Sequence, residues 1–265
     1  MNTIGQLWHP IWLLWWTVIG VPIHAVLKAL LGVLNGNPIA DAIGPFGIAI
    51  VLLTILIKVV LSPLFQYQLV TSRRVQAEQR RIAPELSALR KKYKKDPQRL
   101  NQETMALYRA HNINPLAQMS GCLPALVQSP ILIALFYVIR DAHSTLHIES
   151  FKFLGIMLNE TALQHGQNIA LALLLPLLAG LTTFVQTKMM TPPGGMATQD
   201  ATQAAMTQNM TVIMPIFIAF ISLQFAAALA LYWVASNLFS IGQQYFITGW
   251  GSLSPPRLGR GKKAA

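Results

Sequence analysis

The sequence predicts an all-α membrane protein with several spans. Apolar residue types make up 53% of the 265 residues and charged types only 11%, whereas soluble domains carry about 25% charged residues. Apolar stretches of the roughly 20 residues that cross a bilayer occur at residues 46–67, 119–139, 169–190 and 211–247. The last stretch is too long for one span, and Gln224 and small residues lie near its middle. We therefore predict five transmembrane helices.

The placement of the basic residues predicts which side of the membrane each loop faces. The net charge is +11, and eleven of the 20 Lys and Arg lie between Arg73 and Arg109, together with four acidic residues. Basic loops favour the cytoplasmic side of a membrane. Residues 73–109 and the basic tail after Ser254 are therefore expected in the cytoplasm, and residues 140–167 outside. Five spans then place the N-terminus outside.

These rules give a complete division of the chain. We expect spans at residues 46–67, 118–139, 168–190, 210–226 and 229–248. The external parts are an N-terminal segment, residues 1–45, and a loop, residues 140–167. The cytoplasmic parts are a helical hairpin, a loop and a basic tail, at residues 68–117, 191–209 and 249–265.

The N-terminal segment is predicted to contain an interfacial amphipathic helix. Tryptophan favours the membrane–water boundary. The segment contains four tryptophans, Trp8, Trp12, Trp15 and Trp16. After Pro22 the apolar residues follow helical spacing, while His24, Lys28 and Asn35 share the other face. The alternative is that residues 10–34 form a sixth span, for which their length is sufficient.

The cytoplasmic hairpin is predicted from an apolar stripe and a helix boundary. Ile82, Leu86, Leu89 and Tyr93 recur at steps of four and three residues. Asp96-Pro97 then ends one helix and begins another, since Asp caps helices and Pro fits the first helical position. Its basic residues are candidates for a docking surface, and they are Arg73, Arg74, Arg80, Arg81, Arg90, Lys91, Lys92, Lys94, Lys95 and Arg99. A solvated charged face is the simpler explanation for most of them.

The sequence contains no pattern typical of an enzyme. A nucleotide-driven pump needs a glycine-rich phosphate loop followed by Lys and Ser or Thr, and none occurs. His143 and His147 are four residues apart, but a metal site needs three or four ligands. The single cysteine, Cys122, begins a span, where we expect a packing role. We therefore predict a protein that is not an enzyme and has no metal or cofactor.

Lys58 is the strongest candidate for a functional residue, because it is a charged residue within the first predicted span. A charge at the centre of a span costs about 2.5–3.5 kcal/mol on insertion scales. Tyr67, at the cytoplasmic end, is nine residues away, or roughly 14 Å along a helix. That distance is longer than a lysine side chain easily reaches. We therefore expect Lys58 to face a hydrated groove among the helices.

Other polar residues in apolar surroundings are candidates for the same groove. They are Thr54, Gln128, Gln186, Gln224, Ser236 and Asn237. Taken singly, each is better explained as a hydrogen bond between helices. Together with Lys58 they can line one wet surface.

Several separate motifs resemble one known family. They are Lys58-Val-Val-Leu-Ser-Pro-Leu, Ala83-Pro-Glu-Leu, Gln102-Glu-Thr-Met-Ala-Leu-Tyr108, Asn114-Pro-Leu, Cys122-Leu-Pro-Ala-Leu-Val-Gln-Ser-Pro130, Leu231-Tyr-Trp-Val-Ala-Ser-Asn237 and Gln243-Gln244. In this order, and over most of the chain, they resemble the YidC membrane-protein insertases. The resemblance implies the same five-span topology and a groove that is open to cytoplasm and lipid and closed to the outside.

The resemblance also assigns groove residues. The positive residue of the family's groove corresponds to Lys58. The family more commonly has arginine at this position, and lysine lacks the planar guanidinium group of arginine. Gln186 and Trp233 match further groove positions, and we add Thr54, Gln128 and Asn237. The turn between the last two spans departs from the family's Phe-Pro-Ala/Ser-Gly-Leu and reads Phe225-Ala-Ala-Ala-Leu229.

The function implied is the insertion and folding of nascent membrane proteins in a bacterial cytoplasmic membrane. The partners implied are nascent membrane proteins, the lipid bilayer, the ribosome, the signal-recognition-particle receptor and the Sec translocon, with a monomer as the working unit and no specific nucleic-acid sequence. Two other classes stay open. A transporter or channel for small anions would bind its ligand at Lys58, and a structural assembly partner would pair Lys58 with an acidic residue of another subunit.

Overall fold

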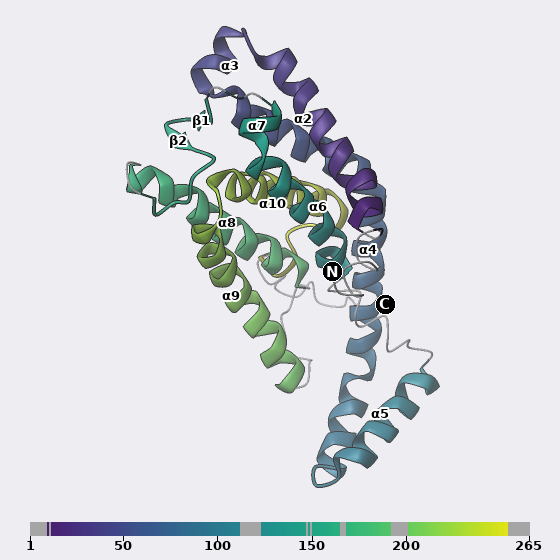
Figure 1. Cartoon of the computed structure of the whole chain (residues 1–265). Coiled ribbons are helices and arrows are strands. Elements are labelled where there is room, and N and C mark those ends of the chain that lie inside the picture. The colour runs from purple at the N-terminus through teal and green to yellow at the C-terminus, as the bar shows by residue number, and fades with distance from the viewer. Residues whose placement is uncertain are drawn as a thin grey trace, which may run out of the picture. The chain divides into compact units, whose positions relative to one another are not determined.

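The computed structural model describes residues 10, 12–111, 123–146, 148, 150–164, 168–191 and 201–253, and most of them are helical (Figure 1). Within these ranges the side chains of residues 79, 123–125 and 201–210 are not described. Trp8, Cys122 and His147 lie outside the described residues. So do large parts of the predicted cytoplasmic loop and tail.

The described elements are mostly α-helices. The helices are α2 (Val21–Leu34), α3 (Pro38–Ile43), α4 (Pro45–Lys92), α5 (Pro97–Ala110), α6 (Leu123–Arg140), α7 (Ala142–Leu146), α8 (Ile169–Met190), α9 (Ala201–Gln224) and α10 (Ala227–Thr248). A π-helical turn, η1 (Trp16–Gly20), precedes α2, and a 3₁₀ turn, η3 (Gly251–Leu253), follows α10. Two short antiparallel strands, β1 (Lys152–Phe153) and β2 (Ile156–Met157), lie between α7 and α8.

Among the described residues, three helices are long and apolar enough to cross a membrane. They are Trp12–Leu34, Pro45–Glu78 and Ile169–Met190. Leu126–Arg140 and Thr211–Gln224 are shorter apolar helices. These lengths and compositions confirm a helical membrane protein, while the count of five spans stays a prediction. Because Trp12–Leu34 has the length of a span, the interfacial and the spanning alternatives both stay open for this segment.

The chain divides into two compact units. The first comprises Met1–Leu61, Ala125–Thr183 and Pro215–Phe239. The second comprises Ser62–Pro124, Phe184–Met214 and Ser240–Ala265. The division falls inside α4, one residue before Pro63.

The apolar stripe of α2 forms part of the core of the first unit. Ile23, Leu27 and Leu31 are each at most 6% exposed, whereas Lys28 is exposed. Their spacing of four residues puts them on one side of the helix. The predicted apolar stripe is therefore buried, whereas the interfacial amphipathic helix stays a prediction, because Val21 and Val33 are exposed as well.

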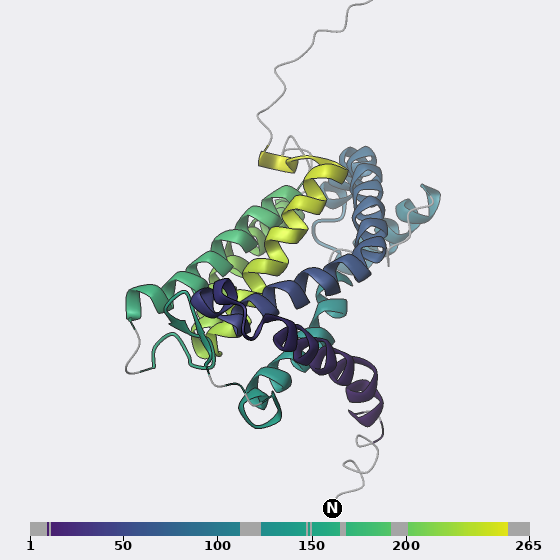
Figure 2. The same cartoon turned by 90° about the horizontal axis from the view of Figure 1, so that it is seen from above.

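The same core continues through α4, α6 and α10. Its largest buried side chains include Phe46, Leu53, Leu135 and Tyr232. A smaller cluster joins α8, α9 and α10 through Ala179, Ile218 and Val234. The first parts of α8 and α10 lie side by side in both views (Figures 1 and 2).

The start of α10 is held by the loop that contains the two strands. The first backbone N–H groups of a helix have no partner within it. Here the amide of Ala227 donates to the carbonyl of Glu160 (2.8 Å), and the amide of Ala228 donates to that of Leu158 (2.9 Å). Loop carbonyls thus cap α10, and α9 ends only three residues earlier, at Gln224. The break lies where the sequence predicts a turn.

In the second unit, α5 begins where the sequence predicts a helix boundary. The side chain of Asp96 accepts a hydrogen bond from the amide of Arg99 (3.0 Å), and Pro97 occupies the first helical position. The helix ends at Ala110. The helix start predicted at Asp96-Pro97 is therefore confirmed.

Side-chain contacts join α5 to the end of α4. The Tyr93 hydroxyl donates to Glu103 (3.5 Å), and His111 contacts the carboxylate of Glu85 (3.2 Å). Within α4, Ile82 and Leu86 are 2% and 5% exposed. The predicted apolar stripe is thus buried at these two positions.

We predict that Gly44→Ala destabilises the fold much more than Gly36→Ala. Both glycines have positive φ, +121° and +81°, but a Cβ at Gly44 would overlap the backbone of Lys152 and Phe153, while a Cβ at Gly36 would meet nothing within 4 Å. A strained backbone residue costs about 1–3 kcal/mol, and the overlap adds to it only at Gly44. Thermal unfolding of the two detergent-solubilised variants tests this, and equal melting temperatures would contradict it.

Candidate functional site

Lys58 lies on α4 inside the first unit and is 6% exposed. Its ammonium group donates a hydrogen bond to the side-chain oxygen of Gln128 on α6 (3.4 Å). Burial of a charge without polar partners is very unfavourable. The contact with Gln128 therefore offsets part of the cost of keeping the charge among apolar helices.

Gln128 continues this contact to a third helix. Its side-chain nitrogen donates to the hydroxyl of Tyr232 on α10, and Tyr232 is only 2% exposed. The carboxamide thus accepts from Lys58 and donates to Tyr232, which joins α4, α6 and α10. We call Lys58, Gln128 and Tyr232 the polar relay.

Sequence reasoning missed Tyr232 as a member of the relay. It selected Trp233 from the same Leu-Tyr-Trp motif, because that residue matched a groove position of the resembling family. One signal was present: a buried tyrosine hydroxyl normally needs a hydrogen-bond partner, and Tyr232 lies in the middle of an apolar segment. The sequence does not reveal that this partner is Gln128.

Thr54 lies one helical turn before Lys58 and is fully buried. Its hydroxyl donates to the carbonyl of Ile50 within the same helix (2.6 Å). Residues four apart in a helix share a face, so Thr54 and Lys58 lie on the same side of α4. The Thr54 hydroxyl therefore donates its hydrogen bond to the backbone of its own helix.

Asn237 and Trp233 make a different set of contacts, to α8 and α9. The amide nitrogen of Asn237 donates to the hydroxyls of Thr182 (3.0 Å) and Thr183 (2.8 Å). Trp233 is half-buried and contacts the small cluster of Ala179, Ile218 and Val234. Both residues therefore hold α10 against neighbouring helices, the role that polar residues in spans most often have.

Gln186 belongs to the second unit and is half-buried. It stays a predicted groove residue. The candidate site of the first unit consists of the polar relay with Thr54 beside it.

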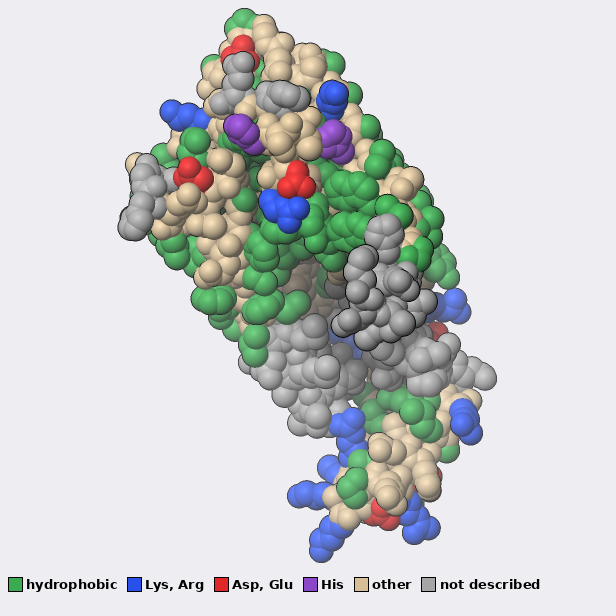
Figure 3. Space-filling view, in the orientation of Figure 1, with side chains coloured by type: hydrophobic (Ala, Val, Ile, Leu, Met, Phe, Trp, Pro, Cys, Tyr) green, Lys and Arg blue, Asp and Glu red, His purple; other side chains and the backbone are tan. Residues whose placement is uncertain are grey.

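The candidate basic residues of the second unit differ in exposure. Most are exposed, namely Arg74, Arg81, Lys91, Lys92, Lys94, Lys95 and Arg99, whereas Arg73, Arg80 and Arg90 are half-buried. Figure 3 shows Lys and Arg side chains gathered around the end of α4 and α5. Arg74 pairs with Glu78 four residues later (3.4 Å), and exposed pairs of this kind contribute little stability.

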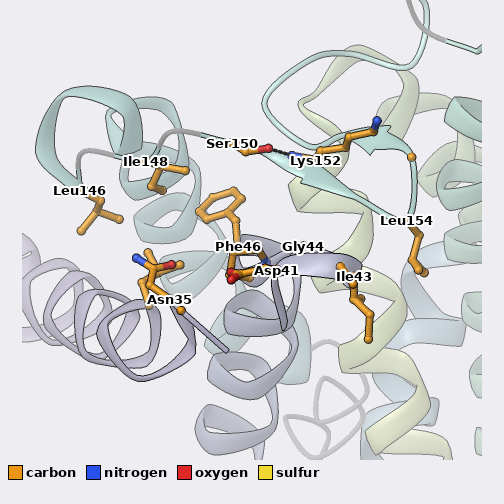
Figure 4. A pocket seen from close by; sticks show the side chains of 15 residues that line it. Asn35, Asp41, Ile43, Gly44, Phe46, Leu146, Ile148, Ser150, Lys152 and Leu154 are labelled. Carbon is orange, nitrogen blue, oxygen red and sulfur yellow. Dashed lines mark hydrogen bonds between the residues drawn. The ribbon is translucent and has the colours of Figure 1, made fainter. Parts of the chain in front are cut away.

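A cavity of about 800 Å³ lies elsewhere in the first unit, where α2, α3 and the start of α4 meet the loop before β1. Asn35 and Asp41 line it together with Phe46, Leu146 and Ile148 (Figure 4). None of the predicted groove residues lines this cavity. It is therefore distinct from the polar relay.

The relay carries one positive charge, on the ammonium group of Lys58. It combines a cationic ammonium group with a neutral amide and a neutral hydroxyl. A carboxylate placed 4 Å from the ammonium gains about 1 kcal/mol in water-like surroundings and about 4 kcal/mol at an effective dielectric constant of 20.

We predict that Tyr232→Phe destabilises the protein more than Tyr245→Phe. The first change leaves the Gln128 nitrogen without its acceptor, at a cost on the order of 1 kcal/mol for a hydrogen bond between membrane helices. Tyr245 lies on the same helix, is 45% exposed and contacts the rings of Phe246 and Trp250. Unfolding midpoints in detergent measure the difference, and a smaller effect of Tyr232→Phe would count against the relay.

Comparison with known proteins identifies the family. The family model described as "60Kd inner membrane protein" matches residues 38–252. The chain is 39% identical over 226 residues to "Membrane protein insertase YidC 1" of Halalkalibacterium halodurans, covering 84% of this chain and 75% of the relative. It is 41% identical over 208 residues to "Membrane protein insertase MisCA" of Bacillus subtilis, covering 77% and 70%. The YidC insertase of Fusobacterium nucleatum is 38% identical over 230 residues, which cover 98% of that relative. The chain therefore belongs to the family of 60Kd inner membrane proteins, the YidC insertase family.

Proposed function

We propose that this chain inserts nascent membrane proteins into the bacterial cytoplasmic membrane, and that Lys58 attracts acidic residues in their translocated tails. The observation that carries the proposal is the cation of Lys58, which lies inside an apolar helix and joins a polar relay across three helices. Membership of the YidC family supports the insertase role.

The energetic problem is the polar tail of the substrate, because its apolar span enters lipid favourably. A span of about 20 residues at roughly −0.3 to −0.6 kcal/mol each releases on the order of 6–12 kcal/mol. A hydrated groove that reaches part of the way across the bilayer shortens the apolar distance for the tail. It thereby lowers the barrier and leaves the end states unchanged.

Lys58 contributes to this path by charge. The attraction estimated above holds an acidic tail residue near the middle of the membrane. A membrane potential then adds roughly 2.3 kcal/mol per charge per 100 mV, which draws acidic tails outward when the inside is negative. Since Lys58 is 6% exposed, we infer that a substrate reaches it only when water or the substrate itself separates the surrounding helices.

The remaining parts of the proposal concern topology and partners. We propose that the N-terminus lies outside and that the tail and the basic end of α4 with α5 lie in the cytoplasm. The exposed basic side chains there suit docking to ribosomes, which carry negative phosphate groups. The signal-recognition-particle receptor and the Sec translocon are further proposed partners, and a monomer is the proposed working unit.

We expect Lys58→Ala and Lys58→Gln to slow the insertion of substrates with acidic tails by at least about fivefold, which corresponds to 1 kcal/mol, while Lys58→Arg retains insertion. Lys58→Gln removes the charge and keeps a hydrogen-bond donor, Lys58→Ala removes both, and Lys58→Arg keeps both. Insertion into vesicles is measured for one substrate with an acidic tail and for the same substrate with a neutral tail. Lys28→Ala, which removes an exposed cation from α2, is the control.

Equal insertion by all Lys58 variants would exclude the charge mechanism. Anion flux through liposomes that contain the purified protein would instead favour a channel. Copurification with another subunit in fixed stoichiometry would favour a structural partner.

Contact between substrate and groove is tested by photo-crosslinking. Crosslinkers at residues 58, 186 and 233 are expected to capture a stalled nascent membrane protein, whereas one at the exposed Lys28 is expected not to. Absence of crosslinks from all three positions, with normal expression, would contradict the proposed path.

A further inference from the structure

Arg73 differs from its neighbour Arg74 in what its side chain contacts. The Nη2 group of Arg73 donates to the backbone carbonyl of Met189 on α8 (2.8 Å) and to the hydroxyl of Thr248 on α10 (3.4 Å). The side chain of Arg74 is 82% exposed and pairs with Glu78. All these residues belong to the second unit. Arg73 is thus directed inward, while Arg74 faces solvent.

The carbonyl that Arg73 contacts lies in the last turn of α8. The last four carbonyls of a helix lack partners within it and carry partial negative charge, which favours a nearby cation. Met189 is the residue before the last of α8 and is fully buried. A guanidinium at this position satisfies a carbonyl that water does not easily reach.

A second segment contacts the same end of α8. The hydroxyl of Ser252 donates to the carbonyl of Lys188 (2.7 Å). Gly251 has φ +58°, and a Cβ there would overlap the carbonyl oxygen of Met189. The backbone of η3 therefore lies directly against the end of α8. Contacts from α4 and η3 thus meet at the end of α8, and Arg73 links this end to Thr248 on α10.

We propose that Arg73 is a positioning residue, which fixes the C-terminal turn of α8 against α4 and α10 and so sets where Gln186 points. Gln186 precedes Met189 by three residues, so movement of this turn moves Gln186 with it. The part of the proposal that concerns substrate rests on the proposed function of Gln186. The part that concerns the helix end does not.

Amide hydrogen exchange tests the helix end. The amide of Thr191 donates to the carbonyls of Thr187 (3.3 Å) and Lys188 (3.2 Å), so exchange at residues 187–191 reports opening of this turn. We expect Arg73→Gln to speed this exchange about tenfold, and Arg73→Lys, which keeps a cationic donor, to change it less than threefold. Arg74→Gln removes the same charge one residue away and is expected to leave exchange unchanged.

Three outcomes would overturn the proposal for the helix end. They are unchanged exchange in Arg73→Gln, an equal increase in Arg74→Gln, and an equal increase in Arg73→Lys. If Arg73→Gln does not fold, the proposal is judged on Thr248→Val, which removes one acceptor and keeps the guanidinium. We expect a smaller increase there, and unchanged exchange would contradict the proposal.

Crosslinking to a stalled nascent chain tests the positioning of Gln186. In Arg73→Gln we expect crosslinks from residue 186 to fall at least twofold and those from residue 233, in the first unit, to stay unchanged. A parallel loss at both positions would show general unfolding and overturn the positioning role. If the unmodified protein gives no crosslinks from residue 186, the proposed groove role of Gln186 fails, while the exchange result still decides the role of Arg73 at α8.

Discussion

The cost of keeping one cation among apolar helices is the constraint on which the first unit depends. Lys58 meets part of this cost through Gln128, which in turn donates to Tyr232. A polar group in such surroundings costs more when it is left unpaired than it gains when paired. The relay therefore fixes how α4, α6 and α10 approach one another, and any path for a charged substrate at Lys58 has to open these contacts.

Local features were the ones that the sequence could predict. The buried stripe of α2, the cap at Asp96 and the break after Gln224 each depend on residues that are close together in the chain. Helical spacing and capping chemistry are short-range rules, so they can be read without a structure. The family resemblance was confirmed for a similar reason, because its motifs are short and contiguous.

Partners distant in the chain were not predictable. Tyr232 is 104 residues from Gln128, and Arg73 is 116 residues from Met189. Arg73 and Arg74 look alike in the sequence as members of a basic segment, yet one lies inside the second unit and the other in solvent. Their difference follows from the face of α4 that each occupies and from which helices pack there. Thr182 and Thr183, which accept from Asn237, were likewise unexpected.

The loop that caps α10 has a consequence for the biogenesis of this protein itself. Leu158 and Glu160 are synthesised well before Ala227 and Ala228, whose amides donate to their carbonyls. Chains fold from the N-terminus as they are made. The receiving surface can thus be in place when the final pair of helices arrives. Because loop carbonyls cap α10, the turn between α9 and α10 does not need capping side chains of its own. This turn can therefore consist of Phe225 and alanines. An insertase must itself be inserted into the membrane, and its last helices can pack against helices and loops that are already in place.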